Sequence, residues 1–372
     1  MKYPREWIDS VRERSDIVEL IGSYVTLRRA GSNYTGLCPF HSERTPSFTV
    51  FPDTQSFFCF GCEAGGDAFT FVMRSENLEY PEAVEFLAKR AGIQIPETHE
   101  DSDQPRGISR ARAYELNRAA ARFYRDCLFD PAIGEAGMNY LRDTRGLDTA
   151  VIRHFGLGYA PNEFGVLLPH LKSLGFTEEE MRQCFLCGRS QSGRYYDYFR
   201  GRVMFPVINT AGEVVAFSGR DVTGTSKAKY LNSSDTPVFQ KRKNLFALNF
   251  AKAHCAEQMI LCEGNMDVVS MHAAGFENAV ASLGTALTDE QARIMARYTK
   301  QVIIAYDGDS AGIKASLRGI DMILKDGLNV RVVLLPDGDD PDSFARKHNA
   351  TELRDFILSH EEDFISFKTR LL

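Results

Sequence analysis

Acidic side chains follow short apolar runs in the last third of the chain, and their chemistry is that of metal ligands. Stretches with helical periodicity separate the runs, and this alternation predicts a parallel α/β sheet with its ligand site at the carboxyl ends of the strands. Carboxylates gathered there repel one another unless a cation lies among them, and Mg²⁺ and Mn²⁺ take oxygen ligands. The pattern therefore predicts a divalent-metal site. Its candidate ligands are Glu263, Asp307, Asp309, Asp340 and Asp342.

None of these acids is a strong signal alone, since loops after strands often carry Asp and Gly for turn geometry. The set is stronger, because all of them would lie at one edge of one sheet. Asp267, one helical turn after Glu263, is predicted either to support the metal ligands or to contact substrate.

Two pairs of metal-binding side chains lie near the start of the chain. Cys38 and His41, and then Cys59 and Cys62, are each spaced by two residues, and 17 residues separate the pairs. Tetrahedral Zn²⁺ needs such pairs, because one tight turn presents two ligands and a hairpin brings the second pair across. Four protein ligands leave no position for water, so we expect one structural Zn²⁺ and a module that unfolds without it.

Other residues near these motifs have a plainer interpretation. Cys184 and Cys187 have the same spacing but no partner pair, so we interpret them as structural residues or as a coincidence of spacing. Aromatic residues around the zinc ligands either stack on unpaired bases or fill a small core, and core filling is the more frequent use. These residues are Phe48, Phe51, Phe57, Phe58 and Phe60.

A basic block precedes the acidic region. Residues 189–252 carry 11 Lys and Arg against 4 Asp and Glu, although the whole chain has a net charge of −6. Such a block is typical of a phosphate-binding surface, and a solvated charged face would give the same pattern. No Walker-type glycine-rich loop is present, so side chains and metal ions would have to hold a triphosphate. The acidic residues at the strand ends and the basic block together predict a nucleotidyl- or phosphoryl-transfer site with two divalent ions.

The elements that must position these groups fall into several domains, and the fold class is multidomain α+β. Residues 97–107 contain no apolar side chain, so we predict a flexible linker over 97–109 after a zinc ribbon, 1–96. We then expect a mixed α/β basic subdomain, 110–251, a parallel α/β subdomain with a helical tail, 252–345, and a further helical segment, 346–372, which the resemblance given below implies to be the start of a truncated helical subdomain.

Length and composition place limits on the class of protein. At 372 residues the chain exceeds one ordinary core. It has 44% hydrophobic and 25% charged residues, no apolar run approaches the roughly 20 residues that span a bilayer, and no signal-peptide core is present. We therefore expect a cytoplasmic protein without a membrane partner. Its eight cysteines are then expected to be reduced or metal-bound.

Motifs along nearly the whole chain share their order and spacing with one known family. The zinc pairs are followed by Lys229–Ser233, Glu263–Asp267, Ala281–Thr288, Asp307–Asp309 and Pro336–Asp342. By these residues the chain resembles the bacterial-type DNA primases. The resemblance implies a DNA-dependent RNA polymerase that makes short RNA primers on single-stranded DNA during replication, from ribonucleoside triphosphates.

The resemblance also implies roles for single residues. It identifies 252–345 as a TOPRIM domain, with Glu263, Asp307 and Asp309 as catalytic ligands of two Mg²⁺ or Mn²⁺ ions and Asp340 and Asp342 as further ligands. Template and nucleotide would bind a basic ridge, with Asp267 beside it. The ridge consists of Arg145, Arg200, Arg202, Arg220, Lys229, Tyr230, Asn232 and Lys241.

The sequence departs from the family at two points. Asn265 stands where the family usually has an aromatic residue, which questions a stacking role there but not the metal site. Only 30 residues follow Asp342, so we expect the family's helicase-binding domain, and with it contact to the replicative helicase, to be missing. A monomer is expected.

Two rival functions use the same residue types. A TOPRIM nuclease or topoisomerase would use these acids to cut the nucleic-acid backbone. A topoisomerase also needs a nucleophilic Tyr in a further large domain. A recombination-mediator-type DNA-binding protein also combines zinc and TOPRIM modules without catalysis. Those chains are shorter and their zinc site is all cysteine, whereas His41 and Lys229–Ser233 favour a primase.

Overall fold

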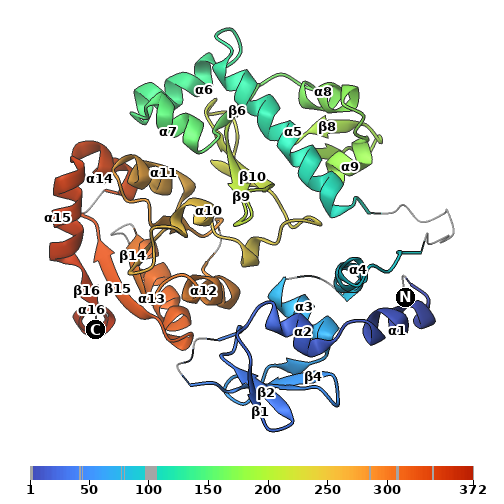
Figure 1. The fold of residues 1–372 in the computed structure, drawn as a ribbon. Helices are drawn as coiled ribbons and strands as arrows, with labels where there is room; N and C mark the ends of the chain where they lie inside the picture. Colours follow the sequence, from blue (N-terminus) through green and yellow to red (C-terminus); the bar gives the residue numbers. More distant parts are fainter. Residues whose placement is uncertain are drawn as a thin grey trace. The chain divides into compact units, whose positions relative to one another are not determined.

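The computed structural model describes residues 3–41, 43, 45–76, 78, 80–96, 107–284, 286–306, 310–336 and 339–371, and it describes 310–316, 350, 370 and 371 by their backbone alone. Two compact units, Met1–Pro105 and Arg106–Leu372, make up the chain (Figure 1). The boundary between them falls inside the segment 97–109 that the composition predicts as a linker.

The first unit is a small antiparallel ribbon covered by helices. β3 (Phe48–Phe51) and β4 (Ser56–Cys59) form the hairpin at the centre of a sheet with the order β1-β2-β3-β4-β5. Because successive strand residues point to opposite faces, Phe48, Val50 and Phe57 all reach the core and are buried. The other elements are α1 (Arg5–Glu13), α2 (Ile17–Gly22), β1 (Arg28–Ala30), β2 (Asn33–Gly36), β5 (Gly65–Gly66), α3 (Ala68–Ser75) and α4 (Tyr80–Arg90).

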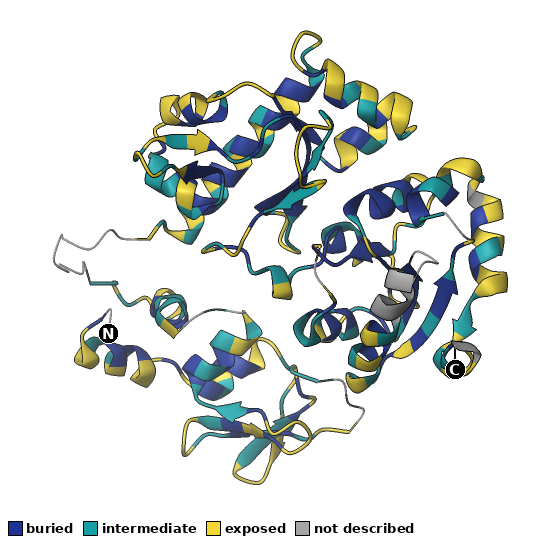
Figure 2. Ribbon diagram, turned by 180° about the vertical axis from the view of Figure 1, so that it is seen from behind, coloured by how far each residue is buried: buried dark blue, intermediate teal, exposed yellow. Residues whose placement is uncertain are grey.

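An antiparallel sheet with the order β11-β10-β9-β6 forms the first half of the second unit. Its long strands β9 (Arg202–Ile208) and β10 (Val214–Asp221) are buried along most of their length, and α5 (Arg110–Phe129) packs against the sheet at β10 and β6 (Figures 1 and 2). Tyr124 of α5 meets Phe217 of β10 with ring centroids 5.5 Å apart. The other elements of residues 107–251 are α6 (Glu135–Asn139), the π-helical turn η1 (Tyr140–Thr144), α7 (Thr149–His154), β6 (Gly158–Ala160), α8 (Leu167–Ser173), α9 (Glu178–Gln183), β7 (Cys187–Arg189), β8 (Tyr195–Asp197), β11 (Tyr230–Asn232), the 3₁₀ turn η2 (Lys241–Lys243) and α10 (Leu248–Ala251).

The second half contains the parallel sheet that the alternating pattern predicts. Four strands run parallel in the order β13-β12-β14-β15. They are β12 (Met259–Cys262), β13 (Ala279–Ala281), β14 (Gln301–Tyr306) and β15 (Asn329–Leu334). The helices of this half are α11 (Asn265–Ala273), α12 (Asp289–Ala296), α13 (Ser310–Lys325) and α14 (Pro341–Lys347).

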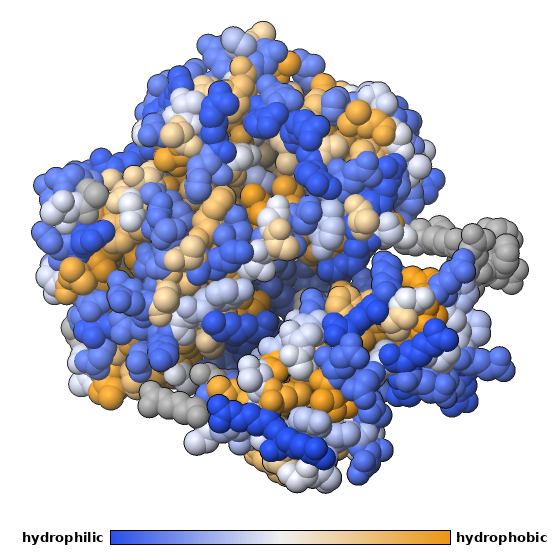
Figure 3. All heavy atoms as spheres, viewed as in Figure 1, coloured by the Kyte–Doolittle hydropathy of each residue, from blue (hydrophilic) through white to orange (hydrophobic). Residues whose placement is uncertain are grey.

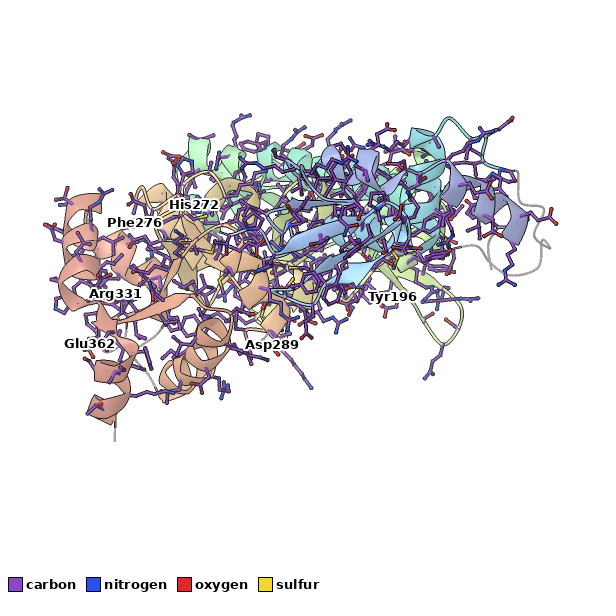
Figure 4. The ribbon with its side chains drawn as sticks, turned by 60° about the horizontal axis from the view of Figure 1, so that its bottom comes forward. Tyr196, His272, Phe276, Asp289, Arg331 and Glu362 are labelled. Carbon is purple, nitrogen blue, oxygen red and sulfur yellow. The ribbon has the colours of Figure 1, made fainter. Side chains whose placement is uncertain are left out.

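The last residues complete this sheet. α15 (Ala350–His360) leads into β16 (Glu362–Asp363), which pairs antiparallel with β15 and forms one edge. Arg331 and Glu362 mark the two strands in Figure 4. Phe367 of α16 (Phe364–Leu371) is buried in the core beneath the sheet. β16 and Phe367, which belong to the segment 346–372 predicted to begin a helical subdomain, thus contact the parallel sheet and its core.

The surface seen in Figure 3 is mostly polar. Hydrophilic residues cover most of the face shown in Figure 3, and apolar ones are scattered between them. Within the described part of the chain, no helix combines the length and apolarity that crossing a bilayer demands.

Candidate functional site

The predicted zinc ligands come together in the first unit. Each of the four residues places one ligand atom within 4.8 Å of the others. Cys38 Sγ lies 3.8 Å from Cys62 Sγ, and Cys59 Sγ lies 3.7 Å from Nδ1 of His41. Three thiols and an imidazole are a donor set of structural Zn²⁺ sites, so these residues fit a metal ion bound by four protein groups.

Tight turns present the ligands on both sides. The N–H of Phe40 points at Cys38 Sγ and that of Gly61 at Cys59 Sγ, each at 3.4 Å. Gly61 has no room for a side chain, because a Cβ there would lie 2.7 Å from Nε2 of His41. The second knuckle therefore requires glycine between its two cysteines.

Glu43 supports the zinc cluster from outside it, and the sequence pattern gave no signal for this. Its carboxylate lies 3.2 Å from Nε2 of His41 and accepts the backbone N–H groups of Cys38, at 2.7 Å, and Ser47, at 3.1 Å. Burial opposes ionisation of Glu43, yet the hydrogen bonds from Ser47 and Cys38 hold its pKa below the usual range. With Nε2 held by Glu43, the Nδ1 atom of His41 is the one that faces the thiols.

We expect Glu43→Ala to weaken Zn²⁺ binding by about 10- to 100-fold, the usual effect of removing a partner that orients a metal-binding His. The measurement is competition for Zn²⁺ against a calibrated chelator. Glu63, outside this hydrogen-bond network, provides the control as Glu63→Ala. Equal Zn²⁺ affinity in the Glu43→Ala variant and the wild type would show that Glu43 does not orient His41.

The aromatic residues predicted near the zinc ligands differ in burial. Phe48 and Phe57 are buried and stack on each other with centroids 5.2 Å apart, so they fill the core. Phe58 and Phe60 are 36% and 69% exposed and pack edge to face. Phe51 is half-buried, so Phe58 and Phe60 are the most exposed of the five aromatic residues predicted near the zinc ligands.

Of the acids predicted at the ends of β12 and β14, Glu263 is within the described residues. Glu263 directly follows β12, and Cys262, the last residue of β12, is in register with Ala305 of β14. Burial and the nearby Glu263 carboxylate raise the pKa of Tyr306, the last residue of β14. Glu263 therefore lies beside the carboxyl end of β14. Asp307 and Asp309, which follow that strand, lie outside the described residues.

The other acids of this edge differ in their surroundings. Asp340 is the N-cap of α14, and its Oδ1 accepts the N–H of Ser343 at 2.6 Å. Asp267 is buried, and its Oδ2 accepts the N–H of Gly264 at 2.9 Å, which fixes the turn after Glu263. These oxygen groups have the chemistry that Mg²⁺ or Mn²⁺ requires.

Asp342 has protein partners. Its side chain is 1% exposed and pairs with Arg145, and it also accepts a hydrogen bond from Ser270 Oγ at 2.6 Å. One predicted metal ligand and one predicted nucleic-acid contact thus bind each other.

Arg202, another residue of the predicted basic ridge, forms its hydrogen bonds with protein groups. Its side chain is buried and donates to the carbonyl groups of Gly219, at 2.9 Å, and Ala228, at 3.1 Å, and to Ser226 Oγ at 2.7 Å. Burial lowers the pKa of its guanidinium. Arg202 therefore holds the segment before β11 against β10.

Arg220 is different, because its buried Nε and Nη1 atoms have no hydrogen-bond partner among the described residues. Its guanidinium lies between two rings, with its carbon 5.2 Å from the centroid of Tyr230 and 5.8 Å from that of Tyr140. Buried donors normally find a partner, so a polar ligand at this point would be strongly favoured. Tyr140 was not predicted from sequence.

Arg220 belongs to a polar patch on one face of β10 and β11. Ser218 pairs with Asn232 and Arg220 with Tyr230, so the four side chains share a face. Ser218 Oγ and Asn232 Oδ1 are also buried without a hydrogen-bond partner within the described residues. Asn232 Nδ2 lies 3.4 Å from the carbonyl of Leu283, which follows β13. The patch therefore borders the parallel sheet.

The remaining predicted ridge residues lie on loops. Lys229 is exposed just before β11, and Lys241 begins η2, where its N–H donates to Asp235 at 2.8 Å. The Arg200 guanidinium carbon lies 3.7 Å from the ring centroid of Phe164, which is 79% exposed. Arginine stacked on an exposed ring is a geometry that also suits nucleic-acid bases.

The fold and these sites define a class of protein in which a zinc ribbon is joined to a basic antiparallel sheet and a parallel α/β domain with an acidic edge. Three family models match in this order: the CHC2 zinc finger at 3–103, the N-terminal domain of the DNA primase catalytic core at 123–252, and a Toprim-like domain at 260–345. The Aquifex aeolicus primase, solved with its zinc-binding and RNA polymerase domains, is 39% identical, and the match covers 96% of this chain and 86% of that one with a TM-score of 0.63. The chain belongs to the bacterial DNA primase family.

Two further relatives extend the comparison. A DNA primase of Pseudomonas putida is 41% identical over 371 residues, which are 98% of this chain and 56% of that protein. This chain thus spans little more than half the length of that relative. A DnaG primase catalytic domain solved with bound single-stranded DNA is 34% identical, and the match covers 70% of this chain and 84% of that one with a TM-score of 0.63.

Proposed function

We propose that the chain is a DNA primase, a nucleotidyltransferase that joins ribonucleotides into short primers on a single-stranded DNA template. The observation that carries the proposal is the polar patch around Arg220, whose unpartnered donors lie on a sheet that borders the acidic strand ends. Membership of the primase family and the relative solved with single-stranded DNA support it.

In this reaction the 3′-hydroxyl oxygen of one nucleotide bonds to the α-phosphorus of the next, pyrophosphate leaves, and the hydroxyl proton passes to a base. Arg220 and Asn232 would hold the incoming triphosphate. Mg²⁺ or Mn²⁺ bound by Glu263, Asp307, Asp309 and Asp340 would neutralise the charge that develops on the transferred phosphoryl group. Two such ions suit this chemistry.

The proposed function assigns roles to the predicted domains. We assign 1–96 to template binding, with Phe58 and Phe60 as its exposed rings, and 97–109 to a linker. We assign 110–251 to the basic part of the polymerase core and 252–345 to its metal-binding part. We propose a monomer in the cytoplasm, without contact to a membrane.

One assay separates the primase from its rivals. The zinc-loaded chain is supplied with single-stranded DNA, labelled ribonucleoside triphosphates and Mn²⁺ or Mg²⁺. Short labelled RNA that requires template supports the primase. Cleaved DNA would instead support a nuclease, and tight DNA binding without product would support a non-catalytic mediator.

Arg220→Met is expected to weaken the binding of a fluorescent ribonucleoside triphosphate by about 10- to 100-fold, because a hydrogen bond to a charged group contributes roughly 1.5–3 kcal/mol. The matched control is Arg189→Met, since Arg189 is also stacked on a tyrosine, Tyr195, at 5.6 Å, but on β7. If both variants bind the nucleotide equally well, the patch is not the triphosphate site.

A further inference from the structure

One carboxylate, that of Asp342, joins three elements of the second unit. Asp342 is in the first turn of α14, and its partners are Ser270 of α11, Arg346 one turn later on α14, and Arg145 just after η1. Arg346 Nη2 lies 3.2 Å from Oδ2 of Asp342. With two cations and a hydroxyl around it, this carboxylate is fully engaged with protein groups.

Arg145 is engaged to a similar extent. Its side chain is 16% exposed, and its Nε donates to the hydroxyl of Tyr140 at 2.9 Å while Nη1 pairs with Asp342. Burial opposes the charge of Arg145, yet Asp342 and Tyr140 keep its pKa above the usual range. Arg346 adds a second link, since its Nη1 donates to the carbonyl of Thr144 at 3.3 Å. The turn after η1 is therefore tied to α14 by two arginines.

We propose that Arg145 and Asp342 are positioning residues, which tie the turn after η1 to the first turn of α14 and thereby hold Asp340 at the acidic edge. Asp340 is the N-cap of α14, two residues before Asp342, so a shift of this turn moves both acids. Loss of Arg145 leaves the buried Asp342 carboxylate with one of its two arginine partners and cuts the direct link from Asp342 to the turn after η1, so the surrounding structure must rearrange. The proposal rests on the proposed function, in which Asp340 binds a divalent ion.

A positioning role for Arg145 and Asp342 has different measurable consequences from the roles that the family resemblance implies. An Arg145 that contacts a template phosphate would, when removed, weaken DNA binding and reduce the slope of log K against log salt by about 0.7. An Arg145 that positions α14 would leave DNA binding unchanged and weaken binding of the divalent ion. If Asp342 binds the ion directly, removing its carboxylate would lower the affinity for the ion further, whichever residue stands at position 145.

The test uses Arg145→Met in the full, zinc-loaded chain, with two readouts that need no catalysis. Calorimetric Mn²⁺ titration is expected to show about 10-fold weaker binding, the lower end of the range for groups that orient metal ligands. Fluorescence anisotropy at several salt concentrations is expected to show unchanged affinity and slope for single-stranded DNA. Weakened DNA binding with unchanged Mn²⁺ affinity would overturn the proposal, and so would no change in either.

Three companion variants make the result specific. Adding Asp342→Asn to Arg145→Met removes the carboxylate that has lost one of its two arginine partners, so the double variant should bind Mn²⁺ no more weakly than the single one, and a further loss would make Asp342 a direct ligand. Tyr140→Phe keeps the packing but removes the hydroxyl that accepts from Arg145, so it should weaken Mn²⁺ binding by about two- to tenfold even if Arg145→Met fails to fold. Arg142→Met removes an exposed charge of the same turn that has no contact with Asp342 and should leave Mn²⁺ affinity unchanged.

These results separate two failures. A wild-type chain that makes no RNA contradicts the proposed function, while the two binding readouts still test the pair. A wild-type chain that primes, together with an Arg145→Met variant that binds Mn²⁺ normally, contradicts the positioning account alone.

Discussion

Glu263→Gln is expected to reduce template-dependent RNA synthesis by roughly 10²- to 10³-fold, the usual effect of losing one group that stabilises charge in a transition state. The substitution keeps the size of the side chain and removes its charge at the end of β12, beside β14. Labelled product resolved on a denaturing gel gives the rate. Binding of single-stranded DNA should be unchanged, because the basic groups on β10 and the zinc module are not altered.

A matched control for this prediction lies on the same domain. Glu277 is exposed after α11 and pairs only with His254, at 3.3 Å, among the contacts that the structure describes. Glu277→Gln removes one negative charge from the domain without touching the strand ends, so its rate should equal the wild-type rate. A Glu263→Gln variant that primes as fast as the Glu277→Gln variant would exclude Glu263 from the catalytic site.

Removal of Zn²⁺ is expected to unfold residues 1–96 and leave the second unit folded. Metal binding contributes about 10–16 kcal/mol to structural zinc sites of this kind, and the two units have separate hydrophobic cores. After treatment with a strong chelator, limited proteolysis should digest the first unit and leave a stable fragment that begins near Arg106. The rate of template-dependent RNA synthesis should also decrease if the first unit binds the template.

The chemistry of the cluster adds a dependence on pH. Burial raises the pKa of the Cys38 thiol in the metal-free protein, so Zn²⁺ must displace a proton to bind. Affinity should therefore fall as the pH is lowered. Cys59→Ser should reproduce the effect of the chelator, whereas Cys127→Ala, on α5 of the other unit, should not. A first unit that keeps its fold without Zn²⁺ would contradict the structural role of the metal.

The features that sequence predicted well are those in which local spacing determines geometry. Two-residue spacing and a hairpin are enough to bring His41 and Cys59 together, because every part of that arrangement is encoded within 25 residues, 38–62. The alternation of apolar runs and helical periodicity likewise predicted the parallel strands β12, β14 and β15. The strand ends then put Glu263 beside β14 without further information.

The features that sequence missed depend on partners far apart in the chain. Asp342 and Arg145 are 197 residues apart, and nothing in either motif shows that they pair. Arg202 has the charge of a phosphate ligand, but the carbonyl groups that surround it are supplied by the fold of the segment before β11. Glu43 lies between the zinc pairs and was overlooked because hydrogen bonds to a ligand leave no spacing pattern.

Binding of Mn²⁺ to the zinc-loaded chain, followed by the electron paramagnetic resonance signal of free Mn²⁺, is the most direct test of the acidic edge. The account predicts that the wild-type chain binds the ion and that Glu263→Gln and Asp309→Ala each lose most of this binding while Glu277→Gln keeps it. Equal binding by all four proteins would contradict it, because the ion would then be held by groups other than the acids at the strand ends.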